Sequence, residues 1–213
     1  MESGTIALVG GGAFTPAVEA IDRRLLELSR ATEVVVLPTA EAFEHPERSV
    51  ERAAAWFGGL GTTSRALNIL QRGDALDVTV AQELGAARFV YLMGDSPLHL
   101  RSVMKDTPAW TALGEVLASG GVVAGVGAAA AALCDPMVDP RGGAFTLGLG
   151  LVRGLALVTE AETWSAERLK RTLDLVRGFA VATLETGAAL LRGPGGWETI
   201  GPVELHGEMP GPG

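Results

Sequence analysis

The sequence predicts an α/β protein in which helices cover both faces of a mostly parallel sheet. Short, uninterrupted apolar runs alternate along the chain with amphipathic stretches, and glycine or proline turns separate them. Uninterrupted apolar runs are typical of parallel strands buried on both faces, whereas strands with one solvated face alternate apolar and polar residues. Right-handed crossovers between such strands produce a three-layer α/β/α sandwich. Because no linker divides the 213 residues, we expect a single domain over residues 1–207.

The first two thirds of the chain supply four strand–helix pairs and a fifth strand. In the first helix, Val18, Ile21, Leu25 and Leu28 recur at helical spacing and define one apolar face. The second strand, "EVVVLPTA", is β-branched and is stopped by Pro38. The expected strands are residues 5–10, 33–40, 64–70, 88–94 and 122–125, and the expected helices are residues 17–29, 46–61, 80–87 and 108–121.

The pattern changes after residue 136, where turn residues become frequent. "GLALVTE" (154–160) is a strand candidate and "SAERLKRTLDLV" (165–176) a helix candidate. Residues 178–206 contain short apolar runs joined by Gly/Pro turns, which indicate a small β-meander at one sheet edge. Residues 208–213 lack an apolar anchor, and we expect a mobile tail there.

Composition excludes several classes of partner. The formal net charge of −8 argues against nucleic acid and anionic membranes, because both need basic patches. The sequence contains no run of about 18 consecutive apolar residues, so no membrane span is predicted. Cys134 is the single cysteine, so an intramolecular disulfide is impossible and a cytoplasmic location is expected. His45, His99 and His206 have no ligand at metal-binding spacing, so we expect neither a metal nor a cofactor. The sequence leaves a homodimer open.

The carboxyl edge of the predicted sheet is the expected place for a ligand. Three loops end there: "GGGAFTP" (10–16), "MGDSPLHL" (93–100) and "GVGAAA" (125–130). The candidate cleft residues in these loops are Gly11, Gly12, Gly94, Asp95, Ser96, Gly127 and Ala128. Asp95 or Ser96 also suits a helix N-cap before Pro97, so the second loop has a structural interpretation as well.

In order along the chain, "ALVGGGAF", "VVVLPTA", "YLMGDSPLHL", "GVGAAA" and "VATLETGAAL" resemble the motifs of the cyanophycinase and dipeptidase E family of serine peptidases. The resemblance covers most of the chain and implies a flavodoxin-like, class I glutamine amidotransferase-like sheet. It also implies a Ser–His–acid mechanism, in which the serine stands at the centre of a strand–turn–helix elbow. Here Gly127 occupies the position of the serine, and Thr159 or Glu160 that of the histidine. Glu185 is the candidate remnant of the acidic member.

Without a nucleophile and a base, the inherited peptidase mechanism should be absent. Loss of either group of such a triad alone costs on the order of 10⁶ in turnover. We therefore expect a pseudoenzyme that binds a small acidic or amide-bearing ligand in the old cleft or has a regulatory role. One alternative is a hydrolase or amidotransferase-like enzyme with a reassigned mechanism that uses cleft carboxylates or Cys134. A second alternative is a structural subunit that pairs with an active paralogue.

Overall fold

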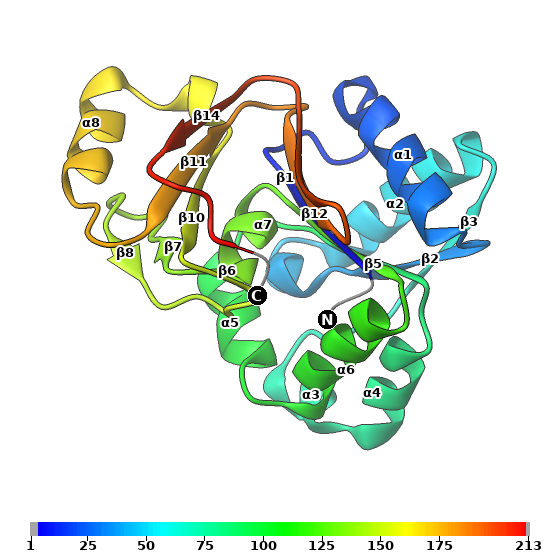
Figure 1. Cartoon of the computed structure of the whole chain (residues 1–213). Coiled ribbons are helices and arrows are strands. Elements are labelled where there is room, and N and C mark those ends of the chain that lie inside the picture. The colour runs from blue at the N-terminus through cyan, green and yellow to red at the C-terminus, as the bar shows by residue number, and fades with distance from the viewer. Residues whose placement is uncertain (1–3, 212–213) are drawn as a thin grey trace.

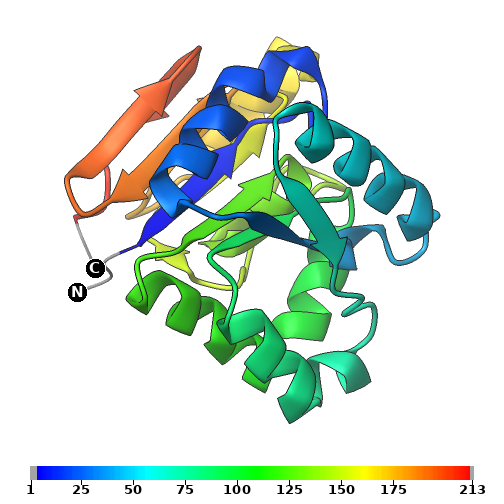
Figure 2. The same cartoon turned by 90° about the vertical axis from the view of Figure 1, so that its right-hand side faces the viewer.

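The computed structural model describes residues 4–211 and contains two main sheets, with helices on both faces of the larger one (Figure 1). The larger sheet has seven strands, and the five adjacent strands from β1 to β3 in spatial order are parallel as predicted. The hairpin of β12 and β13 adds two antiparallel strands at one edge (Figure 2). The spatial order is β13 (Gly196–Ile200), β12 (Ala189–Gly193), β1 (Thr5–Val9), β5 (Val122–Val126), β4 (Phe89–Leu92), β2 (Glu33–Leu37) and β3 (Thr63–Ala66).

Successive side chains of the parallel strands point to opposite faces of the sheet and are buried in two separate cores, because both faces of a parallel sheet are covered. Ala7, Val9, Phe89 and Tyr91 face the first helical layer, and Ile6, Leu8, Val90 and Leu92 face the second. The first layer contains α1 (Glu19–Ser29) and α2 (Pro46–Gly59); the second contains α3 (Arg72–Leu76), α4 (Val78–Gly85), α5 (Pro97–Met104), α6 (Pro108–Ala118) and α7 (Ala128–Leu133). Single turns of 3-10 helix are η1 (Pro16–Val18), η2 (Thr39–Glu41) and η3 (Ala161–Thr163).

The second sheet was not predicted, and it corrects the expectation of a C-terminal β-meander. Its five strands are β14 (Val203–His206), β11 (Ala180–Leu184), β10 (Leu155–Thr159), β6 (Cys134–Asp135) and β9 (Val152–Arg153), beside a ribbon of β7 (Met137–Val138) and β8 (Phe145–Thr146). The four C-terminal strands are therefore divided between two sheets. The physical reason is burial: β11 is buried throughout and packs on both faces, whereas β13 is an exposed edge strand.

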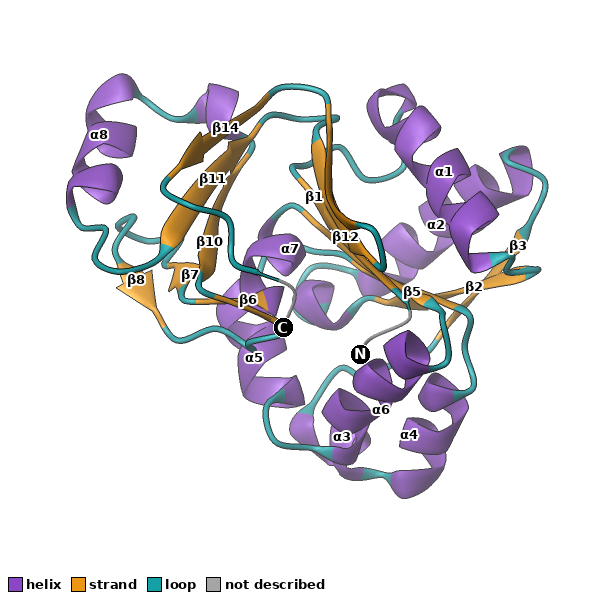
Figure 3. Ribbon diagram, viewed as in Figure 1, coloured by secondary structure: helices purple, strands orange, loops and turns teal. Residues whose placement is uncertain are grey.

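Helix α7 lies between the two sheets and contacts β5 on one side and β10 on the other (Figure 3). The outer face of the second sheet is covered by α8 (Ala166–Asp174), whose Leu169 and Leu173 pack against Val158 and Val181. The carboxyl ends of β5 and β10 consequently face each other across α7, and this arrangement creates the walls of the candidate site.

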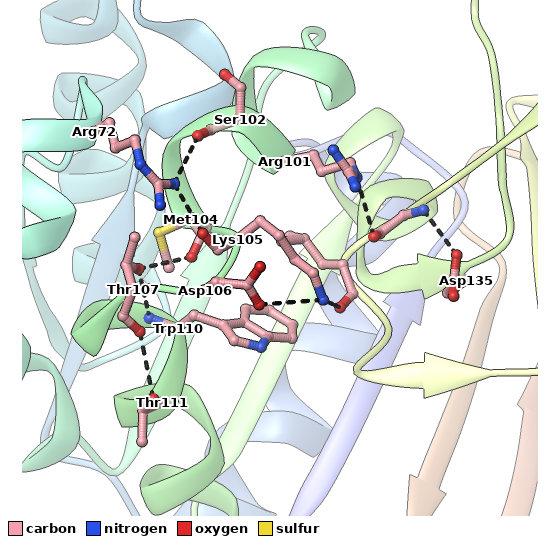
Figure 4. Close-up of polar contacts among 12 residues, drawn as sticks. Arg72, Arg101, Ser102, Met104, Lys105, Asp106, Thr107, Trp110, Thr111 and Asp135 are labelled. Atoms are coloured by element: carbon pink, nitrogen blue, oxygen red, sulfur yellow. Dashed lines mark hydrogen bonds and ion pairs between the residues drawn. The ribbon is translucent and has the colours of Figure 1, made fainter.

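Polar contacts also join α5 to the loop that precedes β9 (Figure 4). Arg101 Nε donates to the Gly148 carbonyl at 3.2 Å, and the Gly148 amide donates to Asp135 Oδ1 at 3.0 Å. Lys105 Nζ donates to the carbonyl of Leu149 at 3.5 Å. These contacts connect the second sheet to the helix that begins at Pro97, next to the second predicted site loop.

The end of the described chain differs from the expectation of an unanchored tail. Met209 packs against the larger core, and Trp197 Nε1 donates to the Pro210 carbonyl at 2.9 Å. Residues 212–213 of the predicted tail lie outside the described residues. Within residues 4–211, no helix is both long and apolar enough to cross a bilayer.

Candidate functional site

The turn between β5 and α7 has the geometry of an elbow. Gly127 has φ +58° and ψ −128°, a region that L-residues adopt only under strain. Its amide donates to the Val9 carbonyl at 2.9 Å, and its carbonyl accepts from Ala131 at 3.2 Å. A Cβ atom built on Gly127 would meet no heavy atom within 4 Å. The turn therefore presents residue 127 to open space, where a nucleophile elbow would present its side chain.

Small residues allow α7 to approach β5 closely behind this turn. A Cβ atom on Gly125 would lie 2.8 Å from Ala130 Cα and 2.8 Å from a methyl group of Leu133. The alanines from Ala128 onward leave room for this contact, and those at 129–132 are buried. The glycine–alanine composition of the segment is thus explained by helix–strand packing as well as by the turn.

A cleft of about 290 Å³ opens beside the elbow. One wall comes from the first residues of α7 and from the loop between β4 and α5, including Ala128, Asp95 and Pro97. The opposite wall comes from the end of β10 and the segment leading into α8, including Glu160 and Trp164. One wall belongs to segments that follow strands of the larger sheet, and the other belongs to the second sheet. Residues that are distant in the chain therefore meet in this cleft.

Carboxylates concentrate around Asp95. Burial and the nearby charge of Asp95 raise the pKa of Glu160 above its ordinary value, with a smaller contribution from Glu162. Burial and the same Asp95 charge raise the pKa of Glu41, on the other side of the loop. Asp95 therefore stands between two carboxyl groups that hold their protons more tightly than free glutamate does, and this part of the cleft attracts cationic groups.

A positive charge also lines the cleft. The Arg168 guanidinium lies 3.7 Å from the centre of the Trp164 ring, and Arg168 Nη2 donates to the Pro140 carbonyl at 2.9 Å. The Ser165 side chain accepts from the Arg168 amide at 3.2 Å and caps the start of α8. The stack and the carbonyl contact hold Arg168 at the wall, so both acidic and basic side chains line the cleft.

The first predicted loop supports the cleft from behind. A Cβ atom on Gly11 would lie 2.6 Å from Glu160 Cγ, and the Gly10 carbonyl accepts from the Glu160 amide at 2.9 Å. Gly12, at φ +82°, lies against Thr186. Gly10 and Gly11 thus position Glu160, and neither Gly11 nor Gly12 is among the residues that line the cleft.

The second loop is divided between the cleft and the core. Asp95 lines the cleft, as predicted. Gly94, at φ +120°, packs against η2, because a Cβ atom there would lie 2.5 Å from the Ala40 carbonyl carbon. The Ser96 amide donates to the Ala40 carbonyl at 3.0 Å, and no side-chain cap is formed at Ser96. The structure therefore assigns Gly94 and Ser96 to the support of the loop.

Three other candidates lie away from the cleft. Glu185 is exposed in the turn between β11 and β12 and does not line the cleft. His99 Nε2 lies 2.8 Å from the Leu70 carbonyl, and its ring packs against Phe43. Cys134 is fully buried, and burial raises the pKa of its thiol far above the usual range. It begins β6, because α7 ends at Leu133. The buried thiol argues against Cys134 as a nucleophile.

Thr159 and Glu160 both line the cleft, so the structure brings either candidate for the histidine position to the elbow. Sequence reasoning did not find Arg168 or Pro97. The signal for Arg168 is its position four residues after Trp164, across the start of α8. No group of three or more His, Cys, Asp or Glu side chains in the described part of the chain is placed to hold a metal ion.

An elbow at the carboxyl end of a central parallel strand, beside a cleft, defines a class of α/β proteins that includes hydrolases. The family model described as Peptidase family S51 matches residues 6–190, and the chain belongs to that family. This confirms the predicted peptidase-family relationship. A comparison with curated proteins found no match.

Two solved structures share the fold. A peptidase from an acI-B1 Actinobacterium superimposes with a TM-score of 0.83 and 24% identity, over 95% of this chain and 89% of that chain. A candidate peptidase E protein from Listeria monocytogenes EGD-e gives a TM-score of 0.65 and 16% identity, over 95% and 98% of the two chains. The predicted α/β fold with a mostly parallel sheet is thus confirmed.

Proposed function

We propose that this member of the peptidase family binds a small ligand in the cleft without cleaving it. The main observation behind this proposal is Gly127, which has the backbone conformation of an elbow but has no side chain to act as a nucleophile toward the cleft beside it. The hydroxyl groups of Thr159 and Thr163 are also at the cleft wall, but no histidine lines it. Thr163 Oγ1 donates to the Glu160 carbonyl at 2.7 Å. A nucleophile needs an adjacent base, and these contacts supply none.

The charges in the cleft favour an amide-bearing ligand over a purely acidic one. Asp95 and Glu160 would repel a carboxylate but accept hydrogen bonds from an amine or an amide N–H. Arg168, which also lines the cleft, is suited to a carbonyl or carboxylate oxygen. A ligand with both hydrogen-bond donors and an acceptor, such as glutamine or an amino-acid amide, matches these lining residues.

Binding can be tested by thermal shift and calorimetry with glutamine, glycinamide and an aspartyl dipeptide as probes. We expect glutamine or glycinamide to raise the melting temperature, and Asp95→Asn and Glu160→Gln to weaken that effect at least tenfold in affinity. Glu185→Gln is the matched control, since Glu185 is an exposed acid outside the cleft. If Glu185→Gln weakens binding as much as Glu160→Gln, or if none of the probes binds, the proposal is wrong.

Loss of peptidase activity is tested separately. The wild-type chain should not be labelled by a fluorophosphonate, as measured by intact mass. Gly127→Ser has room for the new side chain but gains no histidine, so it should not hydrolyse aspartyl dipeptides at a normal peptidase rate. Labelling of a cleft hydroxyl in the wild-type chain would contradict the proposal.

A reassigned acid–base enzyme is the second candidate, and one observation favours it. The raised pKa of Glu160 beside Asp95 resembles the arrangement in which one carboxyl donates a proton and a neighbour stays ionised. Hydrolysis of the same probes by the wild-type chain, lost in Glu160→Gln, would support this candidate. The open cleft gives no support to a purely structural subunit.

A further inference from the structure

A buried carboxyl group lies on the face of the large sheet opposite the second helical layer. Asp22, on α1, is completely buried among the apolar side chains of the first helical layer. Trp56 Nε1, from α2, donates to Asp22 Oδ2 at 2.8 Å. The Tyr91 hydroxyl, from β4, is buried and close enough to interact with the same carboxyl. Neither that hydroxyl nor Asp22 Oδ1 completes a well-formed hydrogen bond, so the cluster has unused polar capacity.

No basic group compensates a charge on Asp22. Within residues 4–211 no Lys, Arg or His forms an ion pair with it. From β4 the facing titratable group is Tyr91, and from α2 the facing polar group is the Trp56 indole. From β5 the layer receives apolar side chains, Ala124 and Val126 among them. On α1 itself, Glu19 and Arg23 pair with each other at the surface.

Burial raises the pKa of Asp22 to about 7, although the contacts with Trp56 and Tyr91 lower it. Burial and the Asp22 carboxyl raise the pKa of Tyr91 well above its usual value, so Tyr91 stays protonated. Near neutral pH, the carboxyl is therefore present in both protonation states. In the charged state it needs a full hydrogen bond from Tyr91, because a buried anion without donors is costly.

Tyr91 is in direct contact with the glycine loop of the site. The Phe14 ring stacks on Tyr91, with centroids 5.5 Å apart and planes at 27°. Phe14 has φ +59°, which is strained for a bulky residue, so its contacts must hold it there. Arg52, on α2, helps to do so: its Nη2 donates to the Ala13 carbonyl at 3.1 Å, and its guanidinium lies 5.9 Å from the centre of the Phe14 ring.

The same loop supports the cleft wall from behind. Gly11 lies against the side chain of Glu160, and Gly10 accepts the Glu160 amide. A chain of contacts therefore runs from Asp22 through Tyr91 and Phe14 to the loop of residues 10–14 and on to the cleft wall. Tyr91 also packs edge-on against Phe57 and Phe89, and close-packed aromatic rings leave little free space, so a shift of Tyr91 displaces its neighbours, Phe14 among them.

We propose that Asp22 is a proton-controlled latch that sets the position of the loop 10–14 and, through it, of Glu160 in the cleft. When Asp22 loses its proton, Tyr91 turns to donate to it, the Phe14 stack shifts and the loop moves. This inference rests on the proposed function only for its effect on ligand binding, because Glu160 lies in the cleft where the ligand would bind. The latch itself is a property of the chain without ligand.

Amide NMR spectra of the ligand-free chain between pH 5.5 and 8.5 test the latch directly. We expect the indole signal of Trp56, assigned with Trp56→Phe, and the backbone amides of residues 10–14 to titrate with one common midpoint near neutral pH. Asp22→Asn should abolish both titrations. Glu160→Gln should leave them in place, which separates Asp22 from the titration of Glu160 itself. Glu19→Gln, an exposed acid on α1, should also change nothing.

Tyr91→Phe keeps Asp22 but removes the group that links it to Phe14. In this variant the Trp56 indole should still titrate and the loop amides should not. If Asp22→Asn does not fold, Tyr91→Phe alone tests the latch. Loop amides that fail to follow Trp56 in the wild-type chain, or that still titrate in Tyr91→Phe, would overturn the latch. These results do not depend on any ligand, so failure of the binding proposal leaves the test intact.

Discussion

Replacement of Gly127 by alanine isolates the cost of the elbow conformation. The added Cβ atom meets no neighbour within 4 Å, so the structure predicts no steric penalty. The backbone, at φ +58° and ψ −128°, lies in a region that is unfavourable for residues with a Cβ atom. Strain of this kind costs roughly 1–3 kcal/mol. Gly127→Ala should therefore lower the free energy of unfolding by about 2 kcal/mol, which corresponds to roughly 4–8 °C in melting temperature for a chain of this length.

Two further glycines give matched comparisons in the same protein. Gly114 is exposed in the middle of α6 with open space around it, so Gly114→Ala should stabilise the chain by about 0.5–1 kcal/mol. Gly94 combines φ +120° with a Cβ position 2.5 Å from the backbone of Ala40. Gly94→Ala should therefore cost more than Gly127→Ala, because a clash is added to the strain.

Urea unfolding followed by circular dichroism at pH 6 measures all three changes. The expected order of stability is Gly114→Ala, wild type, Gly127→Ala and Gly94→Ala. If Gly127→Ala is as stable as the wild type, residue 127 does not hold the elbow conformation in solution. The argument that the turn is preserved without its nucleophile would then be wrong.

Three other predictions follow from individual contacts. The pKa of Asp22 is raised from 3.8 to about 7 on folding, so the contribution of Asp22 to the free energy of unfolding should be fully present below about pH 4 and be lost, by about 4 kcal/mol in all, as the pH rises to about 7; urea titrations at several pH values should show that the difference in stability between the wild type and Asp22→Asn changes over this range. Gly148→Ala should destabilise the chain by about 3 kcal/mol or more, since its Cβ atom would lie 1.6 Å from the Cys134 carbonyl oxygen; thermal unfolding measures this, and a neutral result would contradict the packing of that loop. Asp95→Asn should lower the pKa of Glu160, because the charge of Asp95 helps to raise it; carbon-detected NMR of the carboxyl groups checks the direction.

The order of elements in the first 126 residues could be predicted because each element carries a local signal. The apolar runs of β1, β2, β4 and β5 are uninterrupted, and their helices carry spaced apolar residues and glycine stops. The helices α3 and α5 were not separated from the loops around them, since they have five and eight residues and little periodicity. Residue 127 was recognised as an elbow because a glycine turn lies between an apolar strand and a small-residue helix, at the place that the order of the family motifs implies.

The second sheet could not be predicted, because the pairing partners of β10 and β11 are decided by packing over long distances in the chain. Both strands are apolar and would suit either sheet by local pattern alone. The same limit applies to Asp22, which lies on the apolar face of α1 beside Leu25. Neither its burial nor its contacts with Trp56 and Tyr91 were predicted from the sequence.

The sequence by itself determined the class of fold, the turn at Gly127 and the family, because these depend on local patterns and on motif order. Only the tertiary structure decided which residues form the cleft. Asp95 and Glu160 are 65 positions apart in the chain and meet because α7 separates two sheets whose carboxyl ends face each other. Arg168 reaches the same cleft because α8 covers the second sheet. The burial and mutual repulsion that raise the pKa of Glu160 arise from that juxtaposition, and neither quantity exists until the chain has folded.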